Sequence, residues 1–320
     1  MAADDAVIKP RALRHGDRIA LVAPSRPGAA DRLSAAASYL QNRGYHVAES
    51  PHVRIPRTYL RGDDSARAAE LMACFLDDDI DALFCVRGGY GSGRLLDRLD
   101  YGAVAANPKV LVGFSDTTAL NLALYGRCRL VSFSGAVSDL DLARQEGPDD
   151  LTESSLWQAV TSTAPLGSLP LDRADTEVIK PGRSRGRLVP ATLALLCSQI
   201  GTPYLPDLEE AILLVEDVDE EPYRLDRMLN QLRLSGILER LNGLALGQFR
   251  NCFKESTVWP HGLAAMVADA MREATDMPIL AGIPYGHFSR RLVIPVGVMA
   301  ELDAESSAPA LRILEEAAVE

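Results

Sequence analysis

The feature that most constrains the fold of this sequence is an alternation of short apolar runs with helical patterns, from Arg18 to about Ser134. Continuously apolar runs are typical of parallel strands buried on both faces, and helical stretches between them predict βαβ units. The predicted strands are Ile19–Ala23, His46–Glu49, Ala82–Val86, Val110–Phe114 and Leu130–Phe133. The predicted helices are Asp31–Gln41, Ala66–Phe75, Arg94–Leu99 and Thr117–Leu124. We therefore expect a layered parallel sheet.

The chain changes character between about Thr161 and Arg185, where polar residues, prolines and glycines interrupt the apolar periodicity. Such stretches commonly connect domains. We place a linker at residues 166–184, between an N-terminal domain (1–165) and a C-terminal domain (185–320). Beyond it the pattern predicts helices and strands again. These are helices Ala191–Gln199, Tyr223–Leu234 and Gly262–Ala274, and strands Ala211–Val215, Leu244–Gln248, Leu292–Val298 and Ala310–Leu314.

The net charge and the cysteines limit which binding partners and which cellular compartment we expect. The net charge of -11, with no Lys/Arg-rich block, would repel phosphate backbones and anionic lipid, so we expect neither nucleic acid nor a membrane as partner. The five cysteines are scattered and form no CxxC pair, which indicates reduced thiols. The N-terminus lacks a secretion signal, and no apolar run approaches the ~20 residues of a membrane span. We expect a cytoplasmic protein.

A serine follows one of the predicted strands directly. Val110–Gly113 runs into Phe114 and Ser115, and a helix follows at once. A serine on such a turn projects its hydroxyl into a cleft beyond the strand ends, and the next backbone N–H groups point toward any oxyanion formed there. The nucleophile pattern G-x-S-x-G is incomplete, because Thr117 stands at its second glycine. Taken alone, Ser115 is more simply explained as a helix N-cap.

A glycine-rich loop, Val86–Arg94, follows another predicted strand. Its glycines let the backbone approach a ligand and offer N–H groups to an anion. Taken alone it is compatible with a phosphate site, but it lacks the Lys-Ser/Thr pair of a P-loop. The first βαβ unit carries Ala23-Pro24-Ser25 where a dinucleotide fingerprint would stand. A turn that only reverses the chain is the remaining alternative.

Two ionisable residues end predicted strands in the second half: Glu216 after Ala211–Val215, and His287 after Ile283-Pro-Tyr-Gly. A carboxylate hydrogen-bonded to an imidazole fixes its tautomer and stabilises the imidazolium that forms when it takes a serine proton. Considered singly, Glu216 is explained as a solvated strand end and His287 as a satisfied turn residue. Their joint occurrence with Ser115 favours a catalytic triad.

The histidines do not indicate a metal site. No HExxH pair occurs, and none of the five has Cys or Asp partners at ligand spacing. They are His15, His46, His52, His261 and His287. We therefore expect no bound metal.

Several motifs in one order resemble the LD-carboxypeptidases, a serine peptidase family that includes murein tetrapeptide carboxypeptidases and microcin self-immunity hydrolases. The likeness runs along nearly the whole chain. The motifs are Gly16-Asp-Arg-Ile-Ala-Leu-Val-Ala-Pro-Ser, Tyr59-Leu-Arg-Gly, Arg67-Ala-Ala-Glu-Leu, Cys85-Val-Arg-Gly-Gly-Tyr-Gly, Gly113-Phe-Ser-Asp, Leu214-Val-Glu-Asp, Tyr223-Arg-Leu-Asp-Arg-Met-Leu and Gly282-Ile-Pro-Tyr-Gly-His.

The resemblance implies a role for each residue of the triad. Ser115 would be the nucleophile, His287 the general base and later the general acid, and Glu216 the residue that orients the histidine. Neighbouring acids leave an alternative for the last role, because a shifted alignment would select one of them. They are Asp217, Glu220 and Glu221.

The resemblance also implies that backbone N–H groups of Gly89 and Asp116 stabilise the oxyanion, and that Gly88 and Tyr90 contact the substrate. The implied reaction removes a terminal D-amino acid from an L-residue in a murein tetrapeptide, through an acyl-enzyme and without a cofactor. The implied fold is α/β, a Rossmann-like N-terminal domain with a smaller β-rich C-terminal domain, assembled as a homodimer. The alternatives are a sibling hydrolase of a peptide–nucleotide antibiotic or other amide, and a non-catalytic ligand-binding protein.

Two segments depart from the family pattern. Pro190-Ala191-Thr192 stands where the family has Gly-Gly-Asn, and Ser134-Gly135-Ala136 stands where it has His-Gly-Pro. Replacing glycine by proline or alanine restricts the backbone and adds bulk. We expect the chemistry to be shared and the pocket for a murein stem to be altered.

Overall fold

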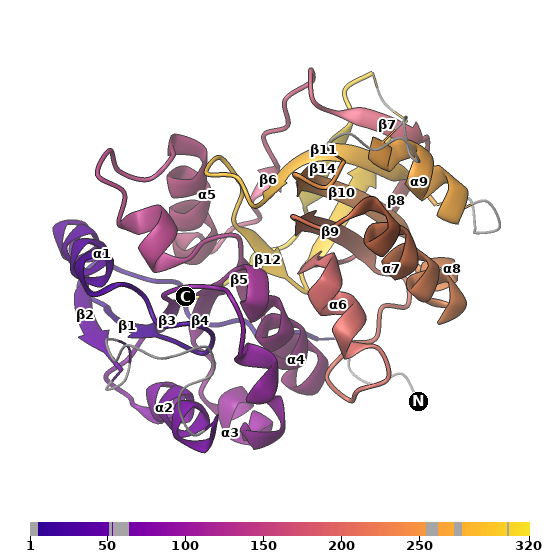
Figure 1. Cartoon of the computed structure of the whole chain (residues 1–320). Coiled ribbons are helices and arrows are strands. Elements are labelled where there is room, and N and C mark those ends of the chain that lie inside the picture. The colour runs from indigo at the N-terminus through magenta and orange to yellow at the C-terminus, as the bar shows by residue number, and fades with distance from the viewer. Residues whose placement is uncertain (1–5, 51–52, 54–63, 254–261, 272–276, 306) are drawn as a thin grey trace.

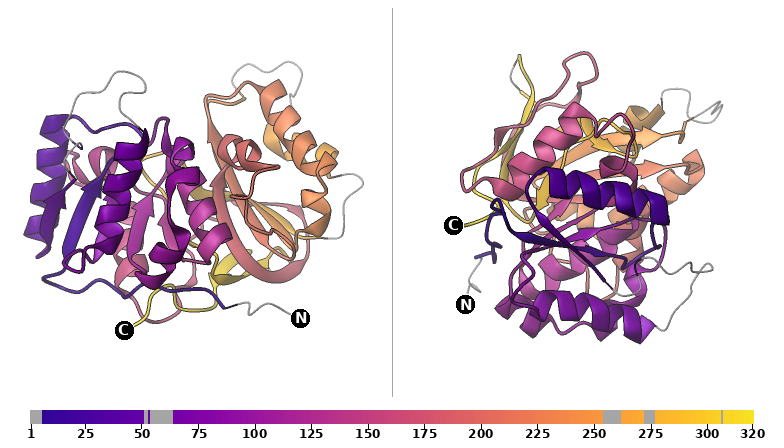
Figure 2. Two further views of the ribbon diagram at one scale, coloured as in Figure 1. Left: turned by 90° about the horizontal axis from the view of Figure 1, so that it is seen from below. Right: turned by 90° about the vertical axis from the view of Figure 1, so that its left-hand side faces the viewer.

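The computed structural model describes residues 6–50, 53, 64–253, 262–271, 277–305 and 307–320. Their strands form two sheets that lie beside each other, each covered by its own helices (Figures 1 and 2). The expected α/β class, with a Rossmann-like parallel sheet and a β-rich second part, is confirmed, and the second sheet is mixed. In the part of the chain that the structure describes, no helix has both the length and the apolarity to span a membrane.

The first sheet has the strand order β12-β5-β4-β3-β1-β2, and β1 to β5 are parallel. Alternate residues of a strand face opposite sides: Ile19 and Leu21 pack toward α1 and α5, whereas Ala20 and Val22 pack toward α2 and α4. The elements are β1 (Arg18–Val22), α1 (Ala30–Asn42), β2 (His46–Glu49), α2 (Asp64–Leu76), β3 (Ala82–Cys85), α3 (Tyr101–Ala106), β4 (Val110–Gly113), α4 (Thr118–Cys128), β5 (Ser132–Ser134), α5 (Asp150–Thr161) and β12 (Ile294–Val296).

The second sheet has the order β6-β14-β13-β8-β9-β10-β11-β7, in which β8 to β11 are parallel. Helices α6 to α9 cover one face, and the other face joins the core shared with the first sheet. The elements are β6 (Gly167–Ser168), β7 (Glu177–Lys180), β8 (Arg183–Thr192), α6 (Leu193–Gln199), β9 (Ile212–Val218), α7 (Pro222–Leu234), α8 (Ile237–Arg240), β10 (Gly243–Arg250), α9 (Gly262–Ala270), β11 (Ile279–Gly286), β13 (Met299–Asp303) and β14 (Ala310–Ile313).

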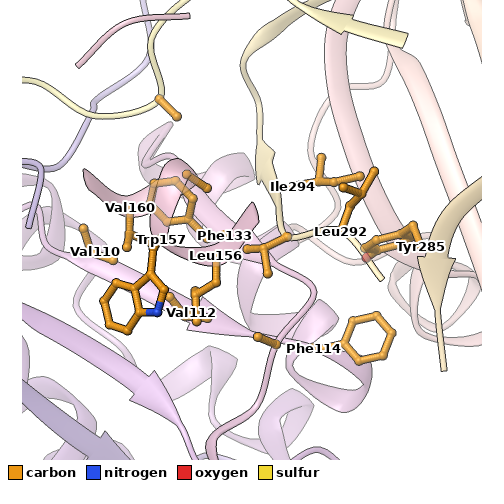
Figure 3. Close-up of a cluster of buried hydrophobic side chains, with 14 of the residues drawn as sticks. Val110, Val112, Phe114, Phe133, Leu156, Trp157, Val160, Tyr285, Leu292 and Ile294 are labelled. Carbon is orange, nitrogen blue, oxygen red and sulfur yellow. The ribbon is translucent and has the colours of Figure 1, made fainter. Parts of the chain in front are cut away.

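Strand β12 ties the two sheets together. It comes from the C-terminal part of the chain but pairs antiparallel with β5, with Ile294 opposite Ser134. A continuous apolar cluster accompanies it, in which Phe114 of the first half meets Tyr285 of β11 edge to face at 5.6 Å (Figure 3). The segment between β11 and β12 is therefore held between the sheets, and it contains His287.

Some predicted elements are displaced. The helix predicted at Arg94–Leu99 is wrong: this stretch forms two 3₁₀ turns, Ser92–Arg94 and Leu96–Arg98. The α-helix begins only at Tyr101, because the Asp100 side chain caps the N–H of Ala103. The strand predicted at Leu130–Phe133 starts two residues later, at Ser132.

Strands also occur where none was predicted. The stretch 166–184 contains β6 and β7, and β8 and β13 were missed altogether. The helix predicted from Ala191 begins at Leu193, because β8 continues through Thr192. The helix predicted at Gly262–Ala274 is present to Ala270, and residues 272–274 lie outside the described residues, as does Tyr59-Leu-Arg-Gly.

Candidate active site

Ser115 lies on the turn between β4 and α4. Its φ of 64° is left-handed, a conformation that a residue with a Cβ adopts only when its surroundings enforce it. Two glycines make room for this turn. A Cβ at Gly113 would lie 2.4 Å from Thr117 Oγ1, and a Cβ at Gly88 would lie 2.8 Å from Ser115 Cβ. The local sequence therefore builds a strained turn that presents a hydroxyl, and the serine is not a simple helix cap.

Three residues distant in sequence meet at this turn. His287 Nε2 lies 2.9 Å from Ser115 Oγ, and His287 Nδ1 lies 2.6 Å from Glu216 Oε2. Glu216 is on β9 and His287 directly follows β11, so both stand near the carboxyl ends of parallel strands. Glu216 is fully buried, whereas 19% of the His287 side chain is exposed. The arrangement is a hydrogen-bonded hydroxyl, imidazole and carboxylate.

The neighbouring acids lie in other surroundings. Asp217 points away from Glu216, as successive residues of a strand do, and its carboxylate accepts the N–H groups of Ala194 and Val218 at 2.8 and 2.9 Å. Glu220 pairs with Arg224 at 3.6 Å, and Glu221 occupies the N-cap position of α7. Of the acids considered from the sequence, Glu216 is the one that contacts His287.

A buried network fixes the backbone around Asp116. Its carboxylate accepts a hydrogen bond from Ser25 Oγ at 2.5 Å and from the Ser92 N–H at 2.8 Å. Ser92 Oγ also donates to the Asp116 carbonyl oxygen at 2.5 Å. The loops after β1, β3 and β4 are thereby joined. Sequence reasoning assigned no role to Ser25 or Ser92, although both follow predicted strands and stand within motifs that it noted.

The glycine-rich loop borders the serine as expected. Gly88 and Gly89 line a cavity beside Ser115, and Gly89 has a φ of 108°. L-residues rarely adopt this φ, and a Cβ at Gly89 would also lie 2.7 Å from Arg26 Cδ, so the position favours glycine. Tyr90 is 43% exposed and, among the described residues, is not part of the cavity lining.

The cavity has a volume of about 440 Å³ and receives side chains from both halves of the chain. Its ionisable lining, apart from His287, is dominated by guanidinium groups, although the whole chain carries a net charge of -11. These are Arg26, Arg87, Arg144, Arg250 and Arg291, against Asp141 and Asp219. Within the described residues, no three His, Cys, Asp or Glu side chains are grouped as metal ligands. The cavity suits an anionic organic molecule.

Arg291 connects the segment after His287 to residues that follow β5 of the first sheet. Its guanidinium donates to Asp141 Oδ2 and to the Phe288 carbonyl oxygen, each at 2.5 Å, and also to the Gly135 carbonyl oxygen. It lies 4.7 Å from the centre of the Phe114 ring and is 5% exposed. Burial raises the pKa of Asp141, and Arg291 opposes that shift. Sequence reasoning missed this residue, because an arginine beside an apolar run carries no distinctive pattern.

Asp217 gives the fold a testable pH dependence. Burial raises the pKa of Asp217 from 3.8 to about 7. At pH values between these two, the folded chain therefore keeps a proton that the unfolded chain loses. The stability contributed by that proton is present below pH 3.8 and is lost as the pH rises through about 7. The unfolding free energy of Asp217→Asn relative to that of wild type should therefore rise by about 3 kcal/mol from pH 4.5 to pH 8. Urea unfolding of both proteins at the two pH values measures this, and a pH-independent difference would contradict it.

Comparisons with known proteins give matches along almost the whole chain. Residues 19–135 match the LD-carboxypeptidase N-terminal domain, and residues 185–302 match the LD-carboxypeptidase C-terminal domain. The chain is 35% identical over 307 residues to a probable murein peptide carboxypeptidase of Bacillus subtilis, covering 94% of this chain and 93% of that one. It is 25% identical over 320 residues to the microcin C7 self-immunity protein MccF of Escherichia coli, covering 91% and 92%. The crystal structure of muramoyltetrapeptide carboxypeptidase from Oxalobacter formigenes superposes with a TM-score of 0.81 at 30% identity, covering 93% and 99%.

Proposed function

This chain belongs to the LD-carboxypeptidase family and is a serine-type peptidase, and from this premise we propose that it removes the terminal D-amino acid from murein tetrapeptides. The hydrogen-bonded set of Ser115, His287 and Glu216 beside the arginine-lined cavity is the observation that carries the proposal. Relatives that cover almost all of the chain are named for murein peptides, which supports the same substrate class.

The proposed reaction is acyl transfer through Ser115. His287 Nε2 takes the hydroxyl proton while Oγ attacks the carbonyl carbon of the L-residue. The C–N bond then breaks, and His287 returns the proton to the departing amine of the D-amino acid. Water, activated by the same imidazole, hydrolyses the acyl-enzyme and frees Ser115. Glu216 holds the imidazole and balances its charge. These steps need no cofactor.

The N–H groups of Gly89 and Asp116 are proposed to stabilise the oxyanion of the tetrahedral intermediate. Gly89 lines the cavity beside Ser115, and the network of Ser25 and Ser92 holds the Asp116 peptide in place. Fixed donors of this kind need no reorganisation during the reaction. Gly88, which borders Ser115, is proposed to contact substrate; Tyr90, which is exposed beyond the cavity lining, keeps that role only as a proposal from family resemblance.

The cavity's arginines support recognition of a free carboxylate at the end of the substrate. Arg87 lies immediately before the first glycine of the glycine-rich loop, and 40% of its side chain is exposed. Its ion pair with Asp139 is long, at 3.5 Å. A guanidinium placed in this way can form charged hydrogen bonds with a peptide carboxylate. Such recognition restricts hydrolysis to the end of a chain, which is the defining property of a carboxypeptidase.

Arg87→Ala should lower kcat/KM for the tetrapeptide by about 10- to 100-fold, corresponding to one charged hydrogen bond. The loss should lie mainly in KM, because the interaction with a remote carboxylate is present before and during the reaction. Steady-state kinetics on the tetrapeptide measures both constants. Arg98→Ala is the matched control, since Arg98 pairs with Asp97 away from the cavity. Equal kinetics for both variants would exclude Arg87 from substrate binding.

The substrate itself is tested with the purified full-length chain. A murein tetrapeptide ending in an L-D linkage, its L-L diastereomer and an aminoacyl-nucleotide are incubated separately, and products are identified by mass spectrometry. Release of the D-amino acid from the first substrate alone supports the proposal. Cleavage of the nucleotide conjugate alone would instead assign the chain the activity of a self-immunity hydrolase, and no cleavage of any substrate would defeat both.

We further propose that the protein is cytoplasmic and forms a homodimer. We also propose that residues 166–184 link its two domains. All five cysteines are free thiols, which is consistent with a reducing compartment. Light scattering during size-exclusion chromatography would give the mass of the assembly, and a monomer at micromolar concentration would contradict the dimer.

A further inference from the structure

Thr192 contacts the carboxylate of the proposed triad through the oxygen that His287 does not contact. It is the last residue of β8 and stands in parallel register with Glu216 of β9. Thr192 Oγ1 donates to Glu216 Oε1 at 2.6 Å, while His287 Nδ1 lies against Oε2. Glu216 is fully buried and Thr192 is 3% exposed. Each oxygen of the buried carboxylate therefore has a donor of its own.

A second threonine extends this contact to the nucleophile. The Thr192 N–H donates to Thr118 Oγ1 at 3.3 Å, and Thr118 Oγ1 lies 3.4 Å from Thr192 Oγ1. Thr118 is fully buried and is the first residue of α4, three positions after Ser115. The contacts thus close a ring: Ser115, His287, Glu216, Thr192 and Thr118, with the backbone of residues 115–118 completing it. This ring joins the two sheets beneath the hydroxyl.

The usual role of a threonine at this position does not explain the arrangement. Thr192 is the N-cap residue of α6, where its hydroxyl would ordinarily accept a backbone N–H. Its side chain makes no such bond. The Asp217 carboxylate instead accepts the Ala194 N–H at 2.8 Å. The hydroxyl of Thr192 is therefore directed to Glu216 while another side chain caps the helix.

We propose that Thr192 is a positioning residue, which fixes the plane of the Glu216 carboxylate and through it the ring and tautomer of His287. The torsion that orients a carboxylate is soft, so a single contact with His287 would leave the plane of a buried Glu216 poorly defined. A second donor defines it, and outer contacts of this kind set the orientation of an imidazole. The inference rests on the proposed function, and it assigns a role to the Pro190-Ala191-Thr192 segment that departs from the family pattern.

Thr192→Val and Thr192→Ser test the role, because valine keeps the shape without the hydroxyl and serine keeps the hydroxyl. Valine should lower kcat by about 10- to 100-fold with KM within about twofold of wild type, and serine should restore most of kcat. Steady-state kinetics on the L-D tetrapeptide measures both constants for each variant. Thermal unfolding of each variant shows whether the fold is retained.

The rate at which a fluorophosphonate modifies Ser115 supplies a readout that needs no peptide. Slower labelling of the valine variant, with recovery in the serine variant, supports the positioning role. Equal labelling rates in all three proteins, or equal losses in both variants, would overturn it. If wild type is labelled but does not cleave the L-D peptide, the proposed substrate fails while the test of Thr192 stands.

Discussion

Replacing Ser115 by alanine is expected to lower kcat for the L-D tetrapeptide by about 10⁵- to 10⁶-fold, the loss typical of a triad nucleophile. The change removes the oxygen that lies 2.9 Å from His287 Nε2. It keeps the Cβ, so the left-handed turn and the contact with Gly88 stay as they are. The loss should therefore appear in chemistry and not in stability. Steady-state kinetics and thermal unfolding of the same preparation separate the two.

His287→Ala should lose almost as much, and the double variant should lose no more than either single variant. The effects of substituting residues that act as one unit do not add, because the second substitution removes a group that is already inactive without the first. Ser198→Ala is the matched control, since Ser198 is an exposed serine of α6 and should keep full activity. A Ser115→Ala variant that retains turnover within tenfold would exclude an acyl-enzyme at this residue.

Strands β1, β3 and β4 of the first sheet could be predicted because burial on both faces makes their sequences almost continuously apolar. Strand β8 was missed for the opposite reason. In its first half, Arg183 and Arg185 alternate with smaller residues. These arginines lie directly opposite Asp303 and Glu301 of β13. Opposite charges on paired strands stabilise a sheet, yet from one strand alone they suggest a solvated loop.

The arrangement of Ser115, His287 and Glu216 was foreseen because each of these residues follows a strand that could be recognised in the sequence. The residues that hold it were not foreseen, because their function depends on partners from distant segments. Arg291 meets Asp141, 150 positions away, and Ser25 meets Asp116, 91 positions away. Thr192 was noticed only as a departure from the family pattern. A local sequence pattern can predict where a strand ends. A buried contact between side chains depends also on the register between two strands, which is known only from the fold.

Glu216→Ala is expected to lower kcat by about 10⁴-fold, the scale of losing the acid of a triad. Without the carboxylate, His287 Nδ1 loses the acceptor at 2.6 Å, and the imidazolium formed during the reaction loses its counter-charge. Asp217→Asn is the matched control on the next residue, because Asp217 contacts Ala194 and not the histidine. Its kcat should stay within about threefold of wild type. Comparable losses in the two variants would mean that the acid paired with His287 had been assigned wrongly.

Glu216→Gln separates orientation from charge. The glutamine oxygen can accept from His287 Nδ1 while its NH₂ group donates to Thr192 Oγ1, since a hydroxyl can serve as donor or acceptor. The imidazole would then keep its tautomer but lose the charge that stabilises its protonated form. The loss in kcat should therefore fall between wild type and Glu216→Ala, and adding Thr192→Val should bring it close to the alanine value. If Gln and Ala variants are equally slow with Thr192 present, charge alone accounts for the contribution of Glu216, and the hydroxyl of Thr192 does not hold the amide in place.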